Sequence, residues 1–306
     1  MKNLLAYSLV MLFLITSIVP APVAAKSGYL PGALLSPPKQ DARLDKTALA
    51  QLCDSLVLDN NYKAIIKSCA SYVRDNAYKE VITPYLVAAY YFTGDSIKSR
   101  NILLREIKAK SYLEIINELL TGDNIALIKY FDIEQNRESV IALALEKYRN
   151  TVNASRKEGG EQVIRFQIND QRIRKLKYAY KKESPEFLEQ MDRNLMSAFS
   201  TQNDSIYRFY KKHGRYFGEA EIGQSVSYWQ PIILCHITDI ELRNSFFQPL
   251  LEKAVQEGNT FKETLVNFIL RTESFANPDF WNTINDRLPA IRKQYDLPDN
   301  YLFNPF

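Results

Sequence analysis

Glycine is scarce in this chain, with 10 residues in a length of 306. Folds rich in β-turns use glycine at many positions, whereas leucine, isoleucine, lysine and glutamate favour helices. We therefore predict an all-α fold, in which antiparallel, repeat-like helical hairpins are followed by a helical bundle domain. Long apolar runs are also missing, because no segment after the first 25 residues is apolar enough to span a bilayer.

Cysteine and histidine are nearly absent, with three cysteines and two histidines. No pair of them has the spacing of metal ligands, and phosphate-binding loops are lacking, so we expect no metal and no other cofactor. Cys53 and Cys69 are spaced to face each other on two antiparallel helices, where an exported chain could form a disulfide. The alternative is that these two and Cys235 are small buried hydrophobic residues.

A strong excess of charge of one sign is missing too. The chain has 39 basic and 35 acidic residues, for a formal net charge of +4. That balance is too mild to indicate binding to nucleic acid or to an anionic membrane surface. We expect a protein partner rather than either of these.

The first 25 residues have the layout of a secretory signal peptide. Lys2 supplies the positive start, Leu4 to Val19 is an uncharged apolar core, and Val23-Ala24-Ala25 offers small residues for cleavage. A membrane anchor is the alternative, but the apolar core is shorter than the ~20 residues of a spanning helix. We therefore expect export to the periplasm or the extracellular space, with residues 26–40 as an extended leader.

Residues 41–150 have a helical pattern with one internal echo. The sequence YFTGDSI at 91–97 is similar to LLTGDNI at 119–125. One hairpin resembles the tetratricopeptide repeat, because large, aromatic, glycine, small and large residues stand at Leu86, Tyr90, Gly94, Ser99 and Leu103. This resemblance implies stacked antiparallel helices with a protein-binding surface, and the alternative is an ordinary helical bundle.

The polar stretch 151–161, which contains Gly159-Gly160, is the best domain boundary, and we predict a second helical domain over 161–306. Proline and glycine residues set the expected helix limits within it. The expected helices include Glu161 to Lys182, Pro185 to about Phe199, Asp204 to His213, a helix containing Pro231, and Asp239 to Glu257.

One carboxylate lies within an apolar helical stripe. The stripe steps by three and four residues through Val163, Phe166, Asp170, Ile173 and Lys177. A buried ionised aspartate needs a partner, and Arg174 follows Asp170 by one turn. Asp170 is either a solvated edge residue paired with Arg174 or a buried carboxylate that orients another helix.

His236 also lies on an apolar face, which it shares with Trp229, Ile232, Ile233, Ile237 and Ile240. A neutral imidazole on such a face must form a hydrogen bond. The common outcome is a histidine satisfied within the core. The functional alternative is a general acid or base oriented by Asp170, Asp192 or Asp239. Cys235 is adjacent in sequence and points elsewhere, so it is a poor nucleophile for His236.

A series of weak motifs over residues 162–275 resembles an uncharacterised bacterial family, a domain of unknown function common in Bacteroidetes. The matching positions are Asp170, Gln171 and Arg174 in DQRIR, then Asp192, Asn194, Ile222-Gly223, His236, and LLEKAVQEG from Leu250 to Gly258. The resemblance implies that His236, Asp170 and Arg174 form one cluster. It implies no reaction.

The chain departs from the family pattern near its end. Arg271-Thr272-Glu273 follows Leu270, Asp286-Arg287 comes late, and Lys293-Gln294-Tyr295-Asp296 replaces a glycine-bearing element. If the acidic residue and the glycine that the family has at these positions form part of a site, this chain lacks them and its activity is in doubt.

Two functions remain open from the sequence. In the first, the protein is an exported, noncatalytic binding protein, and Asp170, Arg174 and His236 form a structural core network. In the second, it is a periplasmic hydrolase in which His236 acts with a carboxylate partner, Asp170, beside a pocket walled by Trp229 and Tyr228. The first predicts a sealed histidine ring, and the second predicts a ring that reaches a pocket.

Overall fold

The computed structural model describes residues 43–303 with the exception of residue 278. Within this part of the chain every regular element is helical, which confirms the all-α prediction. Contacts group the chain from Leu44 onward into one unit. The predicted signal peptide and extended leader lie outside the described residues.

The first helices are short and start at well-defined caps. Asp45 caps the first of them, because its side chain accepts a hydrogen bond from the Ala48 backbone N–H at 2.8 Å. Asn61 caps the next in the same way. The helices are α2 (Lys46–Leu58), α3 (Tyr62–Cys69), η1 (Ala70–Tyr72), α4 (Lys79–Phe92) and α5 (Ser96–Ala109).

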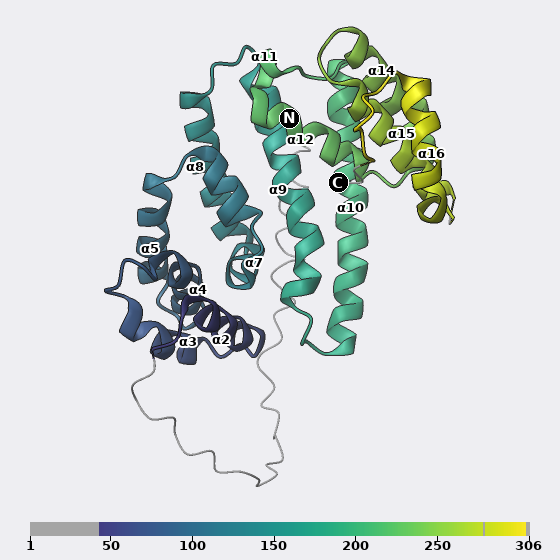
Figure 1. Ribbon diagram of the computed structural model, residues 1–306. Helices are drawn as coiled ribbons and strands as arrows, with labels where there is room; N and C mark the ends of the chain where they lie inside the picture. Colours follow the sequence, from purple (N-terminus) through teal and green to yellow (C-terminus); the bar gives the residue numbers. More distant parts are fainter. Residues whose placement is uncertain (1–42, 278, 304–306) are drawn as a thin grey trace, which may run out of the picture. The chain divides into compact units, whose positions relative to one another are not determined.

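Helices α4 and α5 form a hairpin at the position of the tetratricopeptide-like stretch (Figure 1). Gly94 makes the turn with a φ of +95°, a conformation that favours glycine, and the Asp95 side chain caps α5. Ser99 is fully buried where the helices meet, and its hydroxyl donates to the Val87 carbonyl at 2.7 Å. The small residue therefore allows a close helix contact, while the repeat assignment itself stays a prediction.

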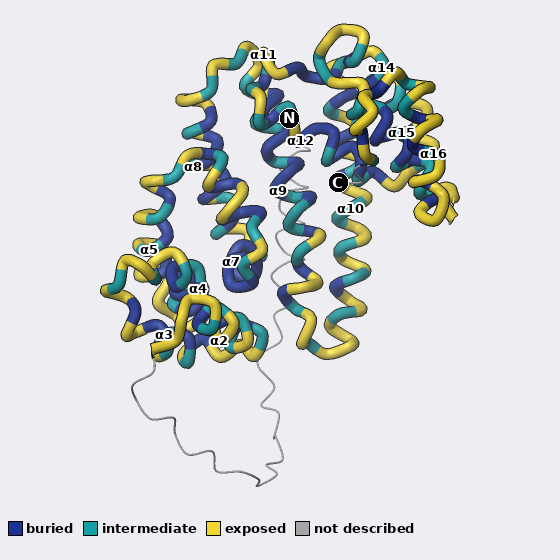
Figure 2. Tube along the Cα trace, viewed as in Figure 1, coloured by how far each residue is buried: buried dark blue, intermediate teal, exposed yellow. Residues whose placement is uncertain are grey.

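The second half of the echo also separates two helical segments. These segments belong to the series α6 (Tyr112–Glu114), η2 (Ile115–Leu120, π-helical), α7 (Ile125–Asp132) and α8 (Glu134–Thr151). Asn124 caps α7, whereas Asp95 caps α5. When the two echo segments are aligned, the position of Asn124 is one residue after that of Asp95. Every residue of α7 from Ile125 to Phe131 is buried, so this helix is central to the core (Figure 2).

The C-terminal half begins with two long helices that pack against each other, α9 (Lys157–Ala179) and α10 (Pro185–His213) (Figure 1). The prediction of a helix break between Phe199 and Asp204 is wrong, because α10 is continuous. No glycine or proline interrupts that stretch, and buried Gln202 donates to the Phe166 carbonyl of α9. Besides α10, helix α9 contacts helices α11 and α12, which follow in the sequence.

The remaining helices are α11 (Glu219–Ile222), α12 (Gln224–Cys235), α13 (Ile240–Leu242), η3 (Arg243–Phe247, π-helical), α14 (Gln248–Gln256), α15 (Lys262–Ala276) and α16 (Phe280–Tyr295). The predicted helix from Asp239 to Glu257 is helical, but only its second part, α14, is a regular α-helix of more than one turn. The π-helical turn of η3 interrupts it, and it places Arg243 fully inside the protein.

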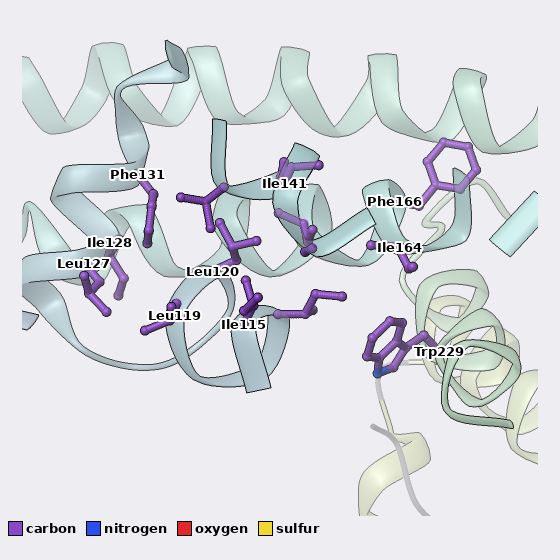
Figure 3. Close-up of a cluster of buried hydrophobic side chains, with 14 of the residues drawn as sticks. Ile115, Leu119, Leu120, Leu127, Ile128, Phe131, Ile141, Ile164, Phe166 and Trp229 are labelled. Carbon is purple, nitrogen blue, oxygen red and sulfur yellow. The ribbon is translucent and has the colours of Figure 1, made fainter. Parts of the chain in front are cut away.

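One hydrophobic core runs across the predicted domain boundary. Its buried side chains extend from Leu49 in α2 to Phe268 in α15, and Figure 3 shows part of it. A smaller cluster joins α15 and α16 to the C-terminal strip, where the Tyr301 hydroxyl donates to Asn267 at 2.6 Å. The stretch 151–161 runs from the last residue of α8 into the first turns of α9, so Gly159 and Gly160 are helical and buried, and the division into two domains there stays a prediction.

Candidate functional site: a buried carboxylate network between α9 and α12

Asp170 is the centre of the network that the sequence singles out. Its side chain is only 2% exposed and accepts hydrogen bonds from three other side chains. His236 Nδ1 lies 2.8 Å from Oδ2, Gln171 Nε2 lies 3.1 Å from the same oxygen, and Arg174 Nε lies 3.2 Å from it. Asp170 is therefore a buried carboxylate rather than a solvated edge residue.

Two local features bring His236 to this carboxylate. Helix α12 packs on α9, and it ends at Cys235 so that His236 is the residue that closes the helix. Asp170 lies on the face of α9 that carries the buried side chains Val163 and Phe166. His236 therefore stands at the end of α12, where its side chain reaches across to Asp170 of α9.

The tautomer of His236 follows from the charge of its partner. An ionised carboxylate can only accept hydrogen bonds, so Nδ1 of His236 carries the proton in this contact. The remaining nitrogen, Nε2, is then the atom that could take up a proton, which is the chemistry of a general base. The side chain is only 10% exposed, and His236 lines none of the three cavities described below.

Two of the proposed network residues lie on the surface of α10 instead. Asp192 forms an exposed ion pair with Lys177 at 2.8 Å, and Asn194 accepts a hydrogen bond from Gln190. Asp239 is exposed as well, because its side chain caps α13. The structure therefore does not bring these three residues to His236. Their helical positions turn them outward, and a sequence pattern without a known helix rotation does not show this.

Trp229 and Gly223 serve the packing and the start of α12 and are not members of the network. Trp229 is 7% exposed and belongs to the same core cluster as Ile164 and Phe166 (Figure 3). Gly223 has a φ of +85° and joins α11 to α12. The predicted wall of Tyr228 and Trp229 does line a cavity of about 450 Å³, but His236 is not among its lining residues.

Arg243 is a buried cation at the end of α12 that sequence reasoning missed. It is 0% exposed, and its guanidinium donates to the carbonyls of Leu234, Cys235 and Ile237 at 3.0, 3.2 and 2.8 Å. It also donates to Thr272 and Phe268 of α15. Burial lowers the pKa of Arg243 to about 10. These backbone bonds hold the end of α12 and so fix the position of His236.

A second buried cation was also missed. Lys129 of α7 is 2% exposed, and its Nζ donates to the Val57 carbonyl at 3.2 Å and to the Asn60 side chain at 2.9 Å. Burial lowers the pKa of this amine. The partners are at the end of α2, far away in sequence, so no local pattern could have identified them. Lys129 therefore ties α7 to α2.

The cysteines are buried and reduced in this structure. Cys53 and Cys69 lie with their Sγ atoms 3.7 Å apart, while Cys235 is buried separately. The hydrogen bond with Cys69, together with burial, raises the pKa of the Cys53 thiol well above its ordinary range. Within residues 43–303, no group of three or more histidine, cysteine, aspartate and glutamate side chains is arranged to hold a metal ion.

Comparisons with protein-family models, with curated proteins and with solved structures found no match for this chain. The resemblance of residues 162–275 to the uncharacterised bacterial family therefore stays a prediction. None of the helices in the described part of the chain has both the length and the apolar character needed to cross a membrane.

Proposed function

We propose that the protein is an exported, noncatalytic binding protein, and that the Asp170 network is a structural link between α9 and α12. Three side chains of the protein donate hydrogen bonds to the carboxylate. A network that joins two helices requires no access to solvent, which agrees with the 10% exposure of His236. Binding is assigned to a different place, the N-terminal helices.

One observation carries this assignment, a cavity of about 370 Å³ among α4, α5, η2 and α7. Cavities of this size match the lower end of ligand pockets, which measure roughly 300–1,000 Å³. Part of the lining is apolar and consists of Val87, Leu103, Leu119 and Leu127. The rest includes four carboxylates, those of Glu80, Glu106, Glu114 and Glu118.

The lining carries a net negative charge. Lys110 is the only basic residue in it, and its Nζ lies 2.6 Å from Glu118 and 3.3 Å from Glu106. Glu114 accepts hydrogen bonds from Ser111 in a capping box. Four carboxylates therefore face one lysine, in a chain whose formal net charge is +4. The negative charge is a property of this cavity and not of the whole molecule.

The partner that fits this lining is a polypeptide segment with lysine or arginine side chains. Their aliphatic stems can cover the leucines while the charged ends reach the carboxylates. Opposite charges across an interface speed association and select the partner. The cavity has room for a few side chains rather than a folded domain, so we expect an extended or helical segment to bind.

Fluorescence anisotropy with labelled model peptides tests this proposal. Three peptides of equal length alternate leucine with lysine, with serine or with glutamate. We expect the lysine peptide to bind best, and its affinity to fall with increasing salt. The double variant Glu80→Lys and Glu118→Lys should weaken this binding at least about tenfold, since like charges then face each other.

The matched control is the double variant Glu146→Lys and Glu189→Lys, which changes the net charge equally at exposed positions outside the cavity. It should bind the lysine peptide as the native chain does. Equal binding of all three peptides, or equal losses in both double variants, would contradict the assignment of this cavity.

The hydrolase alternative is tested separately, because the contact between His236 and Asp170 is also one that a general base could use. The native protein should hydrolyse chromogenic esters and phosphate esters no faster than the His236→Gln variant does. A rate that exceeds this variant and depends on Asp170 would overturn the noncatalytic assignment, whatever the peptides do.

Export is tested by the mass of the mature chain. Full-length protein produced in a bacterium with a periplasm should be recovered from that compartment without residues 1–25. Recovery of the uncleaved chain from the membrane fraction would instead support the membrane-anchor alternative.

A further inference from the structure

A second cavity, of about 470 Å³, lies at the start of α9 and the end of α10, away from the N-terminal helices. It combines three aromatic rings with a group of basic side chains. The rings are those of Phe166, Phe209 and Phe217. The basic residues are Arg156, Arg208, Lys212 and His213, and Glu158 is the one carboxylate in the lining.

The aromatic wall of this cavity is held firmly in place. The rings of Phe209 and Phe217 are stacked at 5.4 Å, and Phe166 meets Phe209 edge-on at 5.6 Å. The backbone of Phe217 is fixed by fully buried Gln230, whose Nε2 donates to its carbonyl at 2.7 Å. A Cβ atom at position 159 would lie 3.2 Å from the Phe217 ring, which is a tight contact. Glycine at this position therefore leaves space for the ring.

The cations of the cavity are only partly neutralised by the protein. Arg208 and Lys212 are one helical turn apart on α10 and exposed. The carboxylate paired with Arg208 is Asp204, at a distance of 3.9 Å and itself exposed. Within residues 43–303, Lys212 has no ion pair. Arg156 is paired with Glu221 at 3.1 Å, so the other two cations carry most of the free positive charge.

His213 lies against the aromatic rings of the cavity and close to two of its cations. Its ring centroid lies 4.8 Å from that of Phe209 and 5.2 Å from that of Phe217. Burial and the neighbouring Lys212 and Arg156 lower its pKa. Cationic neighbours have this effect because they disfavour a further positive charge. The cavity is therefore a place where a negative group would be stabilised.

We propose that this cavity binds a small anion that carries an aromatic group, such as an aryl sulfonate, aryl phosphate or aromatic carboxylate. The anionic group would lie between Arg208 and Lys212, where it replaces water around two cations. The ring would pack on half-buried Phe209, which buried Phe217 supports from behind, because stacked aromatic pairs gain more than their buried area alone. The volume agrees with a ligand of one or two rings, and pockets of this kind measure roughly 300–1,000 Å³.

Fluorescence titration with 8-anilinonaphthalene-1-sulfonate tests both halves of the proposal. Phenyl phosphate should displace the dye, and inorganic sulfate should displace it at least about tenfold less well, because it lacks a ring. N-Phenyl-1-naphthylamine, the uncharged relative of the dye, should bind more weakly for lack of the sulfonate.

Two α10 variants locate the site. Arg208→Glu with Lys212→Glu should raise the Kd of the sulfonate dye at least about tenfold, and Arg208→Gln with Lys212→Gln should raise it less. The matched control is Lys63→Glu with Lys67→Glu, an exposed pair with the same spacing on α3. It should leave the Kd unchanged. All variants replace exposed side chains, and circular dichroism should show the same helical content.

Two results would overturn the proposal. Equal loss of dye binding in the α10 and α3 variants would mean that the dye responds to net charge alone. Displacement by sulfate as effective as by phenyl phosphate would mean that the cavity is a general anion patch without an aromatic subsite. Neither result bears on the peptide cavity of the N-terminal helices, because none of its lining residues is changed.

Discussion

Asp170 and Asp192 show at the residue scale how burial changes the value of one interaction. Each carboxylate accepts a hydrogen bond from a basic side chain of α9, but Asp170 is 2% exposed and Asp192 is 49% exposed. An exposed ion pair contributes ~0–1 kcal/mol to stability. A buried group that loses its partner costs ~1–3 kcal/mol, because the donors left behind are not hydrated.

Replacing these two aspartates by alanine should therefore have different effects. We expect Asp170→Ala to lower the free energy of unfolding by about 2–3 kcal/mol, because His236 Nδ1 loses its partner inside the protein. Asp192→Ala should change it by less than about 0.5 kcal/mol. Denaturant unfolding of both variants measures the difference. Equal stability losses would show that the network contributes no more than a surface pair.

At the scale of the helices, the last carbonyl groups of a helix need hydrogen-bond donors from outside it. For α12 a buried arginine side chain supplies these donors. Arg243 serves three carbonyls at the end of α12 and bonds to α15 through Thr272 and Phe268. The cation also complements the negative end of the helix dipole. One residue thus joins two helices and closes the helix that carries His236.

Arg243→Met should cost at least about 3 kcal/mol of unfolding free energy, because several buried carbonyls then have no donor, at ~1–3 kcal/mol each. Arg193→Met, at an exposed arginine of α10, should stay within about 0.5 kcal/mol. Thermal and denaturant unfolding measure both. A stable Arg243→Met variant would mean that water or a rearranged η3 satisfies these carbonyls.

The two thiols of α2 and α3 make a second element-scale prediction. Their Sγ atoms are 3.7 Å apart, so a disulfide requires little movement. After passage through an oxidising compartment we expect Cys53 and Cys69 to lose their two hydrogens to a disulfide oxidant and to form a bond worth about 3 kcal/mol. Thiol labelling of the denatured, unreduced protein should then detect Cys235 alone. Labelling of all three cysteines would contradict the prediction.

At the scale of the whole molecule, many tyrosines are buried, both in the large core and in the smaller cluster of α15 and α16. Burial and nearby Glu183 raise the pKa of Tyr62 to about 12, and burial and nearby Glu263 raise that of Tyr301 to about 12, from an ordinary value of 10.0. Fully buried Tyr210 is raised further. A group whose pKa is raised on folding contributes stability below its unfolded pKa and loses it as the pH rises through the folded pKa.

We therefore expect alkaline unfolding between pH 10 and about pH 12, the window that these tyrosines define. Helical circular dichroism and tyrosinate absorbance should change together, because the buried phenols ionise only when the core opens. Formation of most of the tyrosinate near pH 10 with the helices intact would contradict this.

Sequence reasoning succeeded where the signal was local. The start of α10 at Pro185 follows from residue types that act within a few positions, because Ser184 caps the helix and proline suits its first turn. Sequence reasoning failed where a helix lacked a stop signal, as in α10, or where a π-turn interrupted a regular pattern, as in η3. The family resemblance implied one cluster of Asp170, Arg174 and His236, and these side chains do meet, but sequence reasoning missed Arg243, whose main partners are backbone carbonyls.

The sequence alone determined that this protein is helical and that Asp170 and His236 lie on apolar faces, because composition and periodicity act along a single chain. The tertiary structure decided which polar residues meet, since the rotation of each helix sends Asp170 inward and Asp192 outward. It also decided where cavities form and which charges line them. These properties depend on side chains brought together from distant parts of the chain, and no local pattern records such distances.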